Sequence, residues 1–191
     1  MSPTFIKKWE HRLHWIASDP RAIVKYLLFY VLSPFRRDAF TPFVILCSPR
    51  TGSNLLVSYL NCHTRVIARA ELCRYRMGRS VEECVRPGIG PQPFHVRAAG
   101  MKVFYGHPYD DNTDALWDYL HRRTGLVIIH LTRRNMLRSA ASFQIALREK
   151  RFVDYSIGRP SPREKKPITI DAADLQRFFE HNHVLMRQRL V

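Results

Sequence analysis

A short loop between an apolar run and an amphipathic segment carries residue types that bind phosphate or sulfate oxygens. It spans residues 48–54 and reads Ser-Pro-Arg-Thr-Gly-Ser-Asn. A helix that follows such a loop presents unpaired N–H groups and a partial positive charge at its N-terminus, so it attracts anions. Gly52 permits close approach of the backbone, Ser53 supplies a hydroxyl donor, and Arg50 adds a forked cation. The alternative is an ordinary tight turn in which Arg50 is solvated.

The spacing of glycine and basic residue in this loop differs from that in the P-loop of nucleoside triphosphatases. The sequence G-x-x-x-x-G-K-[ST] needs a lysine directly after its last glycine, to reach the β- and γ-phosphates. Here Ser53 follows Gly52, and the cation of Arg50 lies two residues before the glycine. A kinase or triphosphatase is therefore disfavoured.

A second basic motif follows a later apolar run at residues 126–131. Arg134 and Asn135 lie where this run gives way to an amphipathic segment, and Ser142 comes eight residues after Arg134. The carboxyl ends of parallel strands meet at one edge of a sheet, and nucleotides bind in the crevice there. We therefore expect Arg134 to lie beside the same sheet edge as Arg50. The alternative is a basic helix start that points into solvent.

The elements that must position these residues alternate between strands and helices. Continuous apolar runs predict buried strands at residues 43–47, 100–105 and 126–131, with a short extended piece at 65–69. Helical spacing predicts helices at 53–62, from 112 or 113 to 124, at 135–150 and from 171 onwards. Glycines and prolines punctuate residues 73–100 and 151–168, which we expect to be mostly loop. The pattern predicts an α/β protein of three layers, with a central parallel sheet flanked by helices.

The composition divides the chain into a basic helical leader, residues 1–38, and an α/β domain, residues 39–191. Within the leader, the segment 22–35 is apolar, but its uninterrupted run has seven residues. A membrane-spanning helix needs roughly 20. The segment is either a core or docking helix that ends at Pro34, or a helix that lies in the surface of an anionic bilayer. The basic residues that flank it are Lys25, Arg36 and Arg37.

The charge balance indicates an anionic partner of unspecified kind. The 191 residues include 31 lysines and arginines against 16 aspartates and glutamates, a net charge of +15. Nucleic acid, a membrane surface and a small polyanion such as a nucleotide all fit that charge. A disordered basic tail is excluded by 12% aromatic residues. The four cysteines form no CxxC pair, and the N-terminal residues lack the pattern of a signal peptide, so we expect reduced thiols in a cytoplasmic protein.

Four segments together resemble the sulfotransferases. They are CSPRTGSNLLVSYLNCH at 47–63, AEL at 70–72, GMKVFYGH at 100–107 and HLTRRNMLRSAASF at 130–143. The resemblance covers roughly residues 42–150 and is closest to bacterial carbohydrate sulfotransferases of the trehalose and nodulation-factor kind. It implies a P-loop-like form of the three-layer fold. It also implies transfer of a sulfuryl group from 3′-phosphoadenosine 5′-phosphosulfate (PAPS) to a hydroxyl of a carbohydrate or glycolipid.

The resemblance assigns the first motif to the 5′ end of the donor and the second to its 3′-phosphate. The residues that would hold the 5′-phosphosulfate are Arg50, Thr51, Gly52, Ser53 and Asn54. Arg50 would also stabilise the charge that develops on the bridging oxygen as it leaves. Arg134 and Ser142 match the family's spacing for the 3′-phosphate site.

Such a reaction requires a general base, because the attacking hydroxyl loses its proton. A glutamate serves in the family at the place of Glu71, which makes it our first choice; the alternative is a surface glutamate paired with neighbouring arginines. His63 and His107 are the rivals: His107 as base or acceptor ligand, and His63 as base, although a histidine that ends a helix needs no catalytic role. Lys102 either points into the site or is solvated at a sheet edge. The other histidines lack companions at ligand spacing, so no metal site is predicted.

The resemblance further implies a segment beyond the last helix that encloses the nucleotide, whereas this chain ends at Val191. We therefore expect a compact or truncated member, in which residues 151–168 could form a basic lid. A catalytically silent protein that binds nucleotides or nucleic acid with the same fold is the second hypothesis, and a P-loop-like kinase the third. The basic residues not assigned to the cofactor would contact an anionic membrane surface at its inner face. Nucleic acid is the less favoured partner. The acceptor and the oligomeric state are left open.

Overall fold

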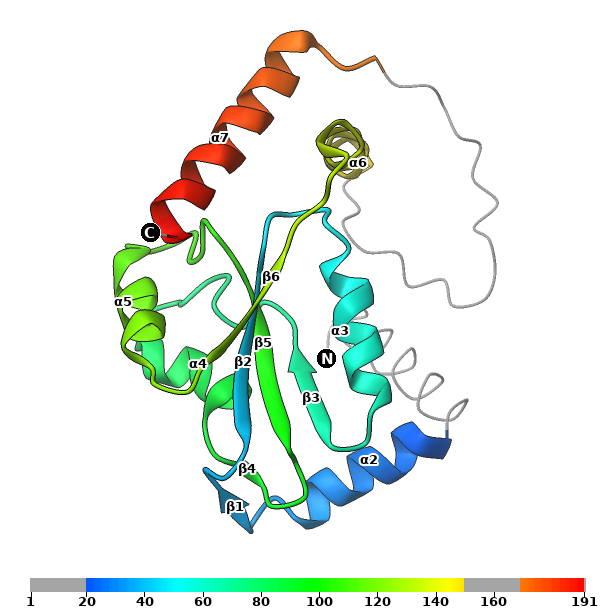
Figure 1. The fold of residues 1–191 in the computed structure, drawn as a ribbon, viewed down its shortest axis with the longest axis vertical. Helices are drawn as coiled ribbons and strands as arrows, with labels where there is room; N and C mark the ends of the chain where they lie inside the picture. The colour runs from blue at the N-terminus through cyan, green and yellow to red at the C-terminus, as the bar shows by residue number, and fades with distance from the viewer. Residues whose placement is uncertain (1–19, 150–168, 191) are drawn as a thin grey trace.

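The centre of the molecule is a parallel sheet of four strands (Figure 1). The computed structural model describes residues 20–149 and 169–190. The strands are β2 (Thr41–Cys47), β3 (Val66–Arg69), β5 (Ala98–Phe104) and β6 (Val127–Leu131), in the order β3-β5-β2-β6. All four were predicted from the sequence. An α/β fold with a central parallel sheet is thus confirmed, while its P-loop-like character stays a prediction.

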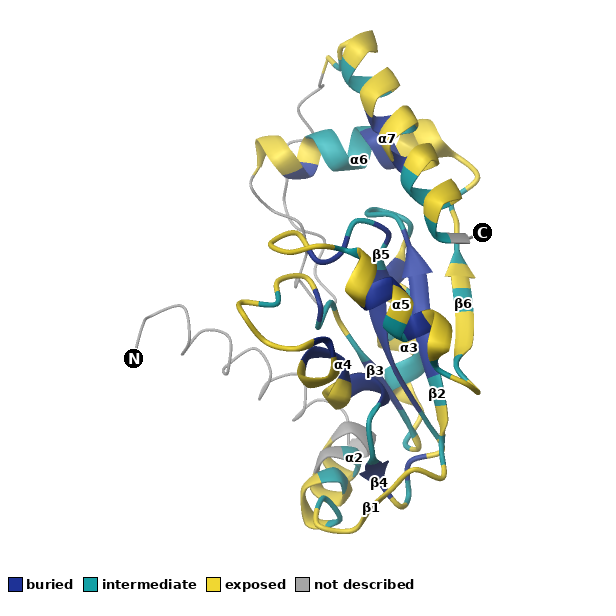
Figure 2. Ribbon diagram, turned by 90° about the vertical axis from the view of Figure 1, so that its left-hand side faces the viewer, coloured by how far each residue is buried: buried dark blue, intermediate teal, exposed yellow. Residues whose placement is uncertain are grey.

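Helices cover both faces of this sheet and form the outer two of three layers (Figures 1 and 2). These helices are α3 (Ser53–Cys62) on one face, and α4 (Val81–Ile89) and α5 (Asp114–Arg122) on the other. Successive residues of a strand point to opposite faces. Phe43 and Ile45 therefore pack on the α3 side, whereas Val44 and Leu46 pack on the α4 and α5 side. This double burial explains why β2 is apolar throughout.

Two further helices lie at the end of the sheet where the strands finish (Figure 1). They are α6 (Met136–Arg148) and α7 (Ala172–Leu190). Asn135 caps α6, because its side-chain oxygen accepts a hydrogen bond from the Arg138 N–H at 2.8 Å. Phe143 of α6 packs on Phe178 of α7 with ring centroids 5.5 Å apart. The predicted helices at 135–150 and after 171 are thereby confirmed within the described residues.

The expectation that residues 73–100 are mostly loop is wrong, since α4 lies within them. Ser80 begins this helix with a capping box. Its hydroxyl accepts from the Glu83 N–H at 3.2 Å, and the Glu83 carboxylate accepts from the Ser80 N–H at 2.7 Å. The buried stripe consists of Val81, Cys84, Val85, Gly88 and Ile89. Burial of this stripe on the sheet stabilises a helix whose last turn contains a proline and a glycine. A two-residue strand, β4 (Gln92–Pro93), follows it and pairs with β1 (Arg36–Arg37).

Helix α2 (Pro20–Val31) docks at the end of the sheet opposite to α6 and α7 (Figure 1). The Lys25 ammonium donates hydrogen bonds to the backbone oxygens of Asn61, His63 and Val66 at 2.9, 3.2 and 2.5 Å. Phe29 packs against a small cluster beneath the helix. The boundary proposed at residue 38 stays a prediction. The leader before residue 20 and the predicted lid at 151–168 lie outside the described residues.

Candidate active site

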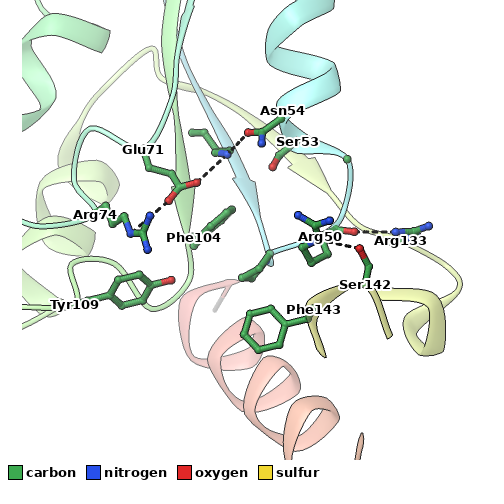
Figure 3. Close-up of a pocket in the computed structure, with 13 residues that line it drawn as sticks. Arg50, Ser53, Asn54, Glu71, Arg74, Phe104, Tyr109, Arg133, Ser142 and Phe143 are labelled. Carbon is green, nitrogen blue, oxygen red and sulfur yellow. Dashed lines mark hydrogen bonds and ion pairs between the residues drawn. The ribbon is translucent and has the colours of Figure 1, made fainter. Parts of the chain in front are cut away.

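A cavity of about 490 Å³ lies at the carboxyl ends of the strands (Figure 3). It collects residues from the loop after β2, the start of α3, the segment after β3, the end of β5 and α6. Six predicted site residues line it: Arg50, Gly52, Ser53, Asn54, Glu71 and Ser142. The position agrees with the crevice in which parallel α/β sheets bind ligands.

The loop after β2 turns sharply, because two of its residues adopt left-handed backbone conformations. Gly52, the residue that caps α3, has φ 95°, which glycine adopts without a steric penalty. Arg50 has φ 66°, a conformation that is uncommon for residues with side chains and that clusters at functional sites. The result is that the first turn of α3 lines the cavity with Ser53 and Asn54. The N–H groups of this turn therefore lie where the sequence predicts an anion site.

The two predicted motifs meet at Arg50. The Arg50 Nε donates a hydrogen bond to the Ser142 hydroxyl of α6 at 2.9 Å. From the β6–α6 junction, Arg133 donates to the Arg50 carbonyl oxygen at 2.9 Å (Figure 3). The strained loop is therefore held from the second motif, and the cation of Arg50 is positioned by a side chain 92 residues away.

Lys102 joins the segment 48–54, which we call the phosphate loop, to Glu71. Its ammonium lies 2.9 Å from a Glu71 carboxylate oxygen and donates to the Asn54 side-chain oxygen at 2.6 Å (Figure 3). The ring of Phe104 is 5.0 Å away. The side chain is only 2% exposed, so the ion pair and hydrogen bond offset the cost of burying its charge. β5 lies between β3 and β2, and the alternative of solvation at a sheet edge is therefore wrong.

His107 lies behind Glu71 and does not line the cavity. Its Nδ1 accepts the Phe104 N–H at 3.2 Å, so the neutral ring carries its proton on Nε2. That nitrogen is 3.8 Å from a Glu71 oxygen, beyond hydrogen-bond distance. Complete burial lowers the pKa of His107 to about 3, and the charges of Arg74 and Lys102 add to the effect. The histidine is therefore neutral, and its contact with Glu71 is not an ion pair.

Several residues of the cavity were missed as site residues or left open by the sequence: Arg74, Lys102, Phe104, Tyr109, Arg133 and Phe143. Most of them adjoin a predicted residue along the chain or alternate with one on a strand, which is the signal that could have found them. Tyr109 has no such signal. It reaches the cavity through the turn after β5, where its ring packs edge-on against His107 with centroids 4.8 Å apart. Burial raises the pKa of Tyr109.

Three predicted residues lie elsewhere. The Thr51 hydroxyl donates to the Ser48 carbonyl oxygen at 2.9 Å, and the residue lines a second, apolar cavity of about 610 Å³ instead of the first. Arg134 is exposed and does not line either cavity. His63 ends α3, as expected, and is exposed. Its assignment as a base therefore has no geometric support.

Comparison with known proteins shows similarity to nodulation protein H of Rhizobium tropici, at 28% identity over 155 residues. The alignment covers 73% of this chain and 58% of that relative, so the chain spans little more than half of the relative's length. No family model matches the chain, and no solved structure matches it. The relative's name agrees with the nodulation-factor side of the resemblance seen in the motifs.

Proposed function

We propose that this protein is a sulfotransferase that moves a sulfuryl group from PAPS to a hydroxyl of a carbohydrate or glycolipid. The observation that carries the proposal is one cavity with the loop after β2 and the first turn of α3 on one wall and a carboxylate, Glu71, on the other. Four cations line the same cavity, Arg50, Arg74, Lys102 and Arg133, and two of them, Lys102 and Arg74, lie 2.9 and 4.0 Å from the Glu71 carboxylate. Similarity to nodulation protein H supports a transferase of this family at the coarse level. The donor and the acceptor are inferred from the motifs.

The loop would bind the phosphosulfate end of the donor. The N–H groups of the first α3 turn and the Ser53 hydroxyl offer hydrogen bonds to anionic oxygens. Arg50 offers a fixed cation where the bridging oxygen gains charge as the sulfur–oxygen bond breaks. Ser142 keeps that cation oriented through its hydrogen bond at 2.9 Å. Adenosine 3′,5′-bisphosphate is the leaving group of such a step.

Glu71 would accept the proton of the attacking hydroxyl as its oxygen bonds to sulfur. Lys102 holds one carboxylate oxygen at 2.9 Å, which leaves the other directed toward Arg74 and His107. We assign His107 to positioning the residues behind Glu71 and not to proton transfer. It is buried and neutral, and its Nδ1 already accepts a hydrogen bond from the backbone. The aromatic side chains of Tyr109 and Phe104 beside Glu71 provide flat apolar walls of the kind on which sugar rings pack.

A thermal-shift comparison tests the donor. Adenosine 3′,5′-bisphosphate should raise the melting temperature more than AMP or ATP does, because a ligand that binds the folded state stabilises it by about 2.7 kcal/mol at a hundred times its Kd. Equal shifts for all three nucleotides, or no shift, would contradict the proposal. Arg134→Ala tests the 3′-phosphate assignment that rests on the resemblance alone, since Arg134 does not line the cavity. Loss of the preference for the 3′-phosphate would support that assignment, and an unchanged preference would remove it. Arg138→Ala is the matched control and should keep the preference for the 3′-phosphate, since Arg138 is an exposed arginine in the first turn of α6.

Labelled PAPS tests the transfer. The chain should label members of a panel of cell-envelope sugars and glycolipids, and Glu71→Gln should lower the rate by about 100-fold or more, the usual contribution of a general base. The variant should keep its melting-temperature response to the bisphosphate. Glu82→Gln, on an exposed position of α4, is the control. A full rate in Glu71→Gln would remove Glu71 as the base. A protein that binds the bisphosphate and labels no acceptor would instead be the silent binder of the second hypothesis.

A further inference from the structure

Helix α2 directs the charged side chain of Lys25 toward the domain and apolar side chains toward solvent, the reverse of an ordinary surface helix. Between Ile23 and Val31 the one charged residue is Lys25, and its ammonium points inward to three backbone oxygens of the domain. Phe29, one turn later, also packs inward. The outward side carries apolar side chains that are 45–69% exposed: Ile23, Val24, Leu27, Tyr30 and Val31. Helical spacing of 100° per residue places these five on one side.

This apolar side continues onto the loops next to the helix. Phe35 is 66% exposed and Phe94 45% exposed. The two residues are adjacent, because the Phe94 N–H donates to the Phe35 carbonyl oxygen at 3.1 Å. We call the seven residues the α2 face; Figure 2 shows α2 largely exposed at one end of the molecule. Exposed apolar patches with polar residues at their rim mark interaction sites for proteins or membranes.

The charges around the α2 face are almost all positive. The three segments that meet at this end, residues 23–41, 61–69 and 90–98, contain six lysines and arginines and one acidic residue, Asp38. Four arginines of these segments are exposed: Arg36, Arg37, Arg65 and Arg97. Arg97 and Arg65 lie together, since the N–H of the first donates to the carbonyl oxygen of the second at 2.8 Å.

We propose that this end of the molecule binds the surface of an anionic lipid bilayer, with α2 lying in the headgroup region. An apolar helix side that carries aromatic residues and has arginines around it matches the composition of interfacial helices. No helix in the described part of the chain is long and apolar enough to cross a membrane, so α2 would lie on the bilayer. A second copy of the chain is the less favourable occupant, because pairing at this face would bring the arginines of both copies together.

The bilayer surface and the candidate active site occupy opposite ends of the sheet (Figure 1). β2 runs between them over seven residues, which corresponds to about 20 Å at roughly 3.3 Å per residue. The attached protein would therefore hold its cavity away from the lipid headgroups and open to solution. The α2 face can consequently be changed without touching any residue of the cavity.

Sedimentation with lipid vesicles tests the proposal. The full chain should bind vesicles of phosphatidylcholine with phosphatidylserine, bind phosphatidylcholine alone much more weakly, and be released as salt is raised. The double variant Leu27→Glu, Val31→Glu should lose binding, since it places charges on the apolar side. Arg36→Glu with Arg37→Glu should weaken binding by about thirtyfold or more, given roughly 1 kcal/mol for each arginine near an anionic surface.

The matched control is Val184→Glu, an apolar residue of α7 that is 51% exposed and lies away from α2. It should bind anionic vesicles as the unchanged chain does, and melting temperatures of all variants should confirm that they fold. Absence of binding to any vesicle, or full binding by the Leu27→Glu, Val31→Glu variant, would overturn the proposal. A dimer in light scattering that the same variant dissociates, without vesicle binding, would show that a second copy covers the α2 face.

Discussion

Among single residues, Lys102 is the side chain that links the two walls of the candidate active site. It emerges from the middle of the sheet, is almost completely buried, and contacts one residue of the phosphate loop and one of the opposite wall. A buried ion pair adds little stability relative to apolar packing, but loss of one partner leaves the other charge uncompensated. Lys102 therefore fixes where Glu71 stands more than it stabilises the fold.

Replacement of Glu71 by leucine tests this view. Glu71→Leu should lower the free energy of unfolding by about 3–5 kcal/mol, because it leaves the charge of Lys102, whose side chain is only 2% exposed, without its carboxylate partner. Urea unfolding followed by circular dichroism measures the change. Arg122→Met is the control. It breaks an exposed pair with Asp118 at 3.5 Å and should cost less than about 1 kcal/mol.

The double variant Lys102→Met, Glu71→Leu distinguishes an uncompensated charge from a simple loss of packing. When both partners become apolar, no charge remains buried, so part of the stability should return. A double variant as unstable as the two single changes added together would show that the ion pair was not the cause.

The sequence predicted one half of the site better than the other. The residues of the phosphate loop follow one another along the chain, and their types alone indicated an anion, as Arg50 and Ser53 illustrate. Ser142 was found only through the spacing that the family resemblance implies. Tyr109 was not found, because Gly106, Pro108 and Asp110 indicate a turn after β5 but not that this turn brings Tyr109 to the cavity. Arg133 and not Arg134 lines the cavity, a distinction that two neighbouring arginines of the same type do not show in the sequence.

At the scale of elements, strands were predicted more reliably than the segment between them. β2, β5 and β6 are continuous apolar runs because they lie inside a covered parallel sheet, a pattern that few other structures produce. α4 was missed, since its proline and glycines suggested loop, although Ser80 and Glu83 carried a capping signal. The two-residue strands β1 and β4 are too short to have a periodicity at all.

Gly100 sets how closely the two central strands approach each other. It pairs with Phe43 across β2 and β5, and a Cβ at this position would lie 2.2 Å from the Phe43 carbonyl oxygen. Gly100→Ala should therefore lower the free energy of unfolding by about 3 kcal/mol or more, as overpacking against rigid backbone does. Chemical denaturation measures it, with soluble expression as a second readout.

Gly125→Ala provides the comparison for this change. Gly125 has φ 71° and open space around its Cα, so the substitution meets only the backbone penalty of about 1 kcal/mol. Equal losses at the two positions would mean that the close contact between β2 and β5 does not limit the sheet.

At the scale of the whole molecule, the candidate active site and the α2 face lie at opposite ends of the sheet (Figure 1). The carboxyl ends of the strands carry the cavity and its four cations, while the opposite end carries the α2 face and its arginines. Both ends thus contribute basic residues to the net charge of +15. Both regions are tied to one core, and because small single domains unfold cooperatively, a change in one buried group reports on the stability of the whole.

His107 is the buried group whose protonation should control how that stability depends on pH. Its pKa is about 3 in the folded chain, against an ordinary value of 6.5. Above pH 6.5 the ring is neutral in both states and adds no pH dependence. As the pH falls below 6.5, the unfolded chain binds a proton that the folded chain does not, so the free energy of unfolding falls. The loss should reach about 2 kcal/mol at pH 5, given 1.36 kcal/mol per unit.

Replacement of His107 by asparagine isolates this contribution. The asparagine oxygen can still accept the Phe104 N–H, but the side chain does not titrate, so the decline in stability between pH 7 and pH 5 should be smaller by about 2 kcal/mol. Urea unfolding of both proteins at the two pH values gives the difference, in which titrations common to both cancel. His181→Asn, at an exposed position of α7, should leave the decline unchanged. If His107→Asn loses as much stability on acidification as the unchanged chain, His107 is not held neutral by burial, and its assignment to positioning fails with it.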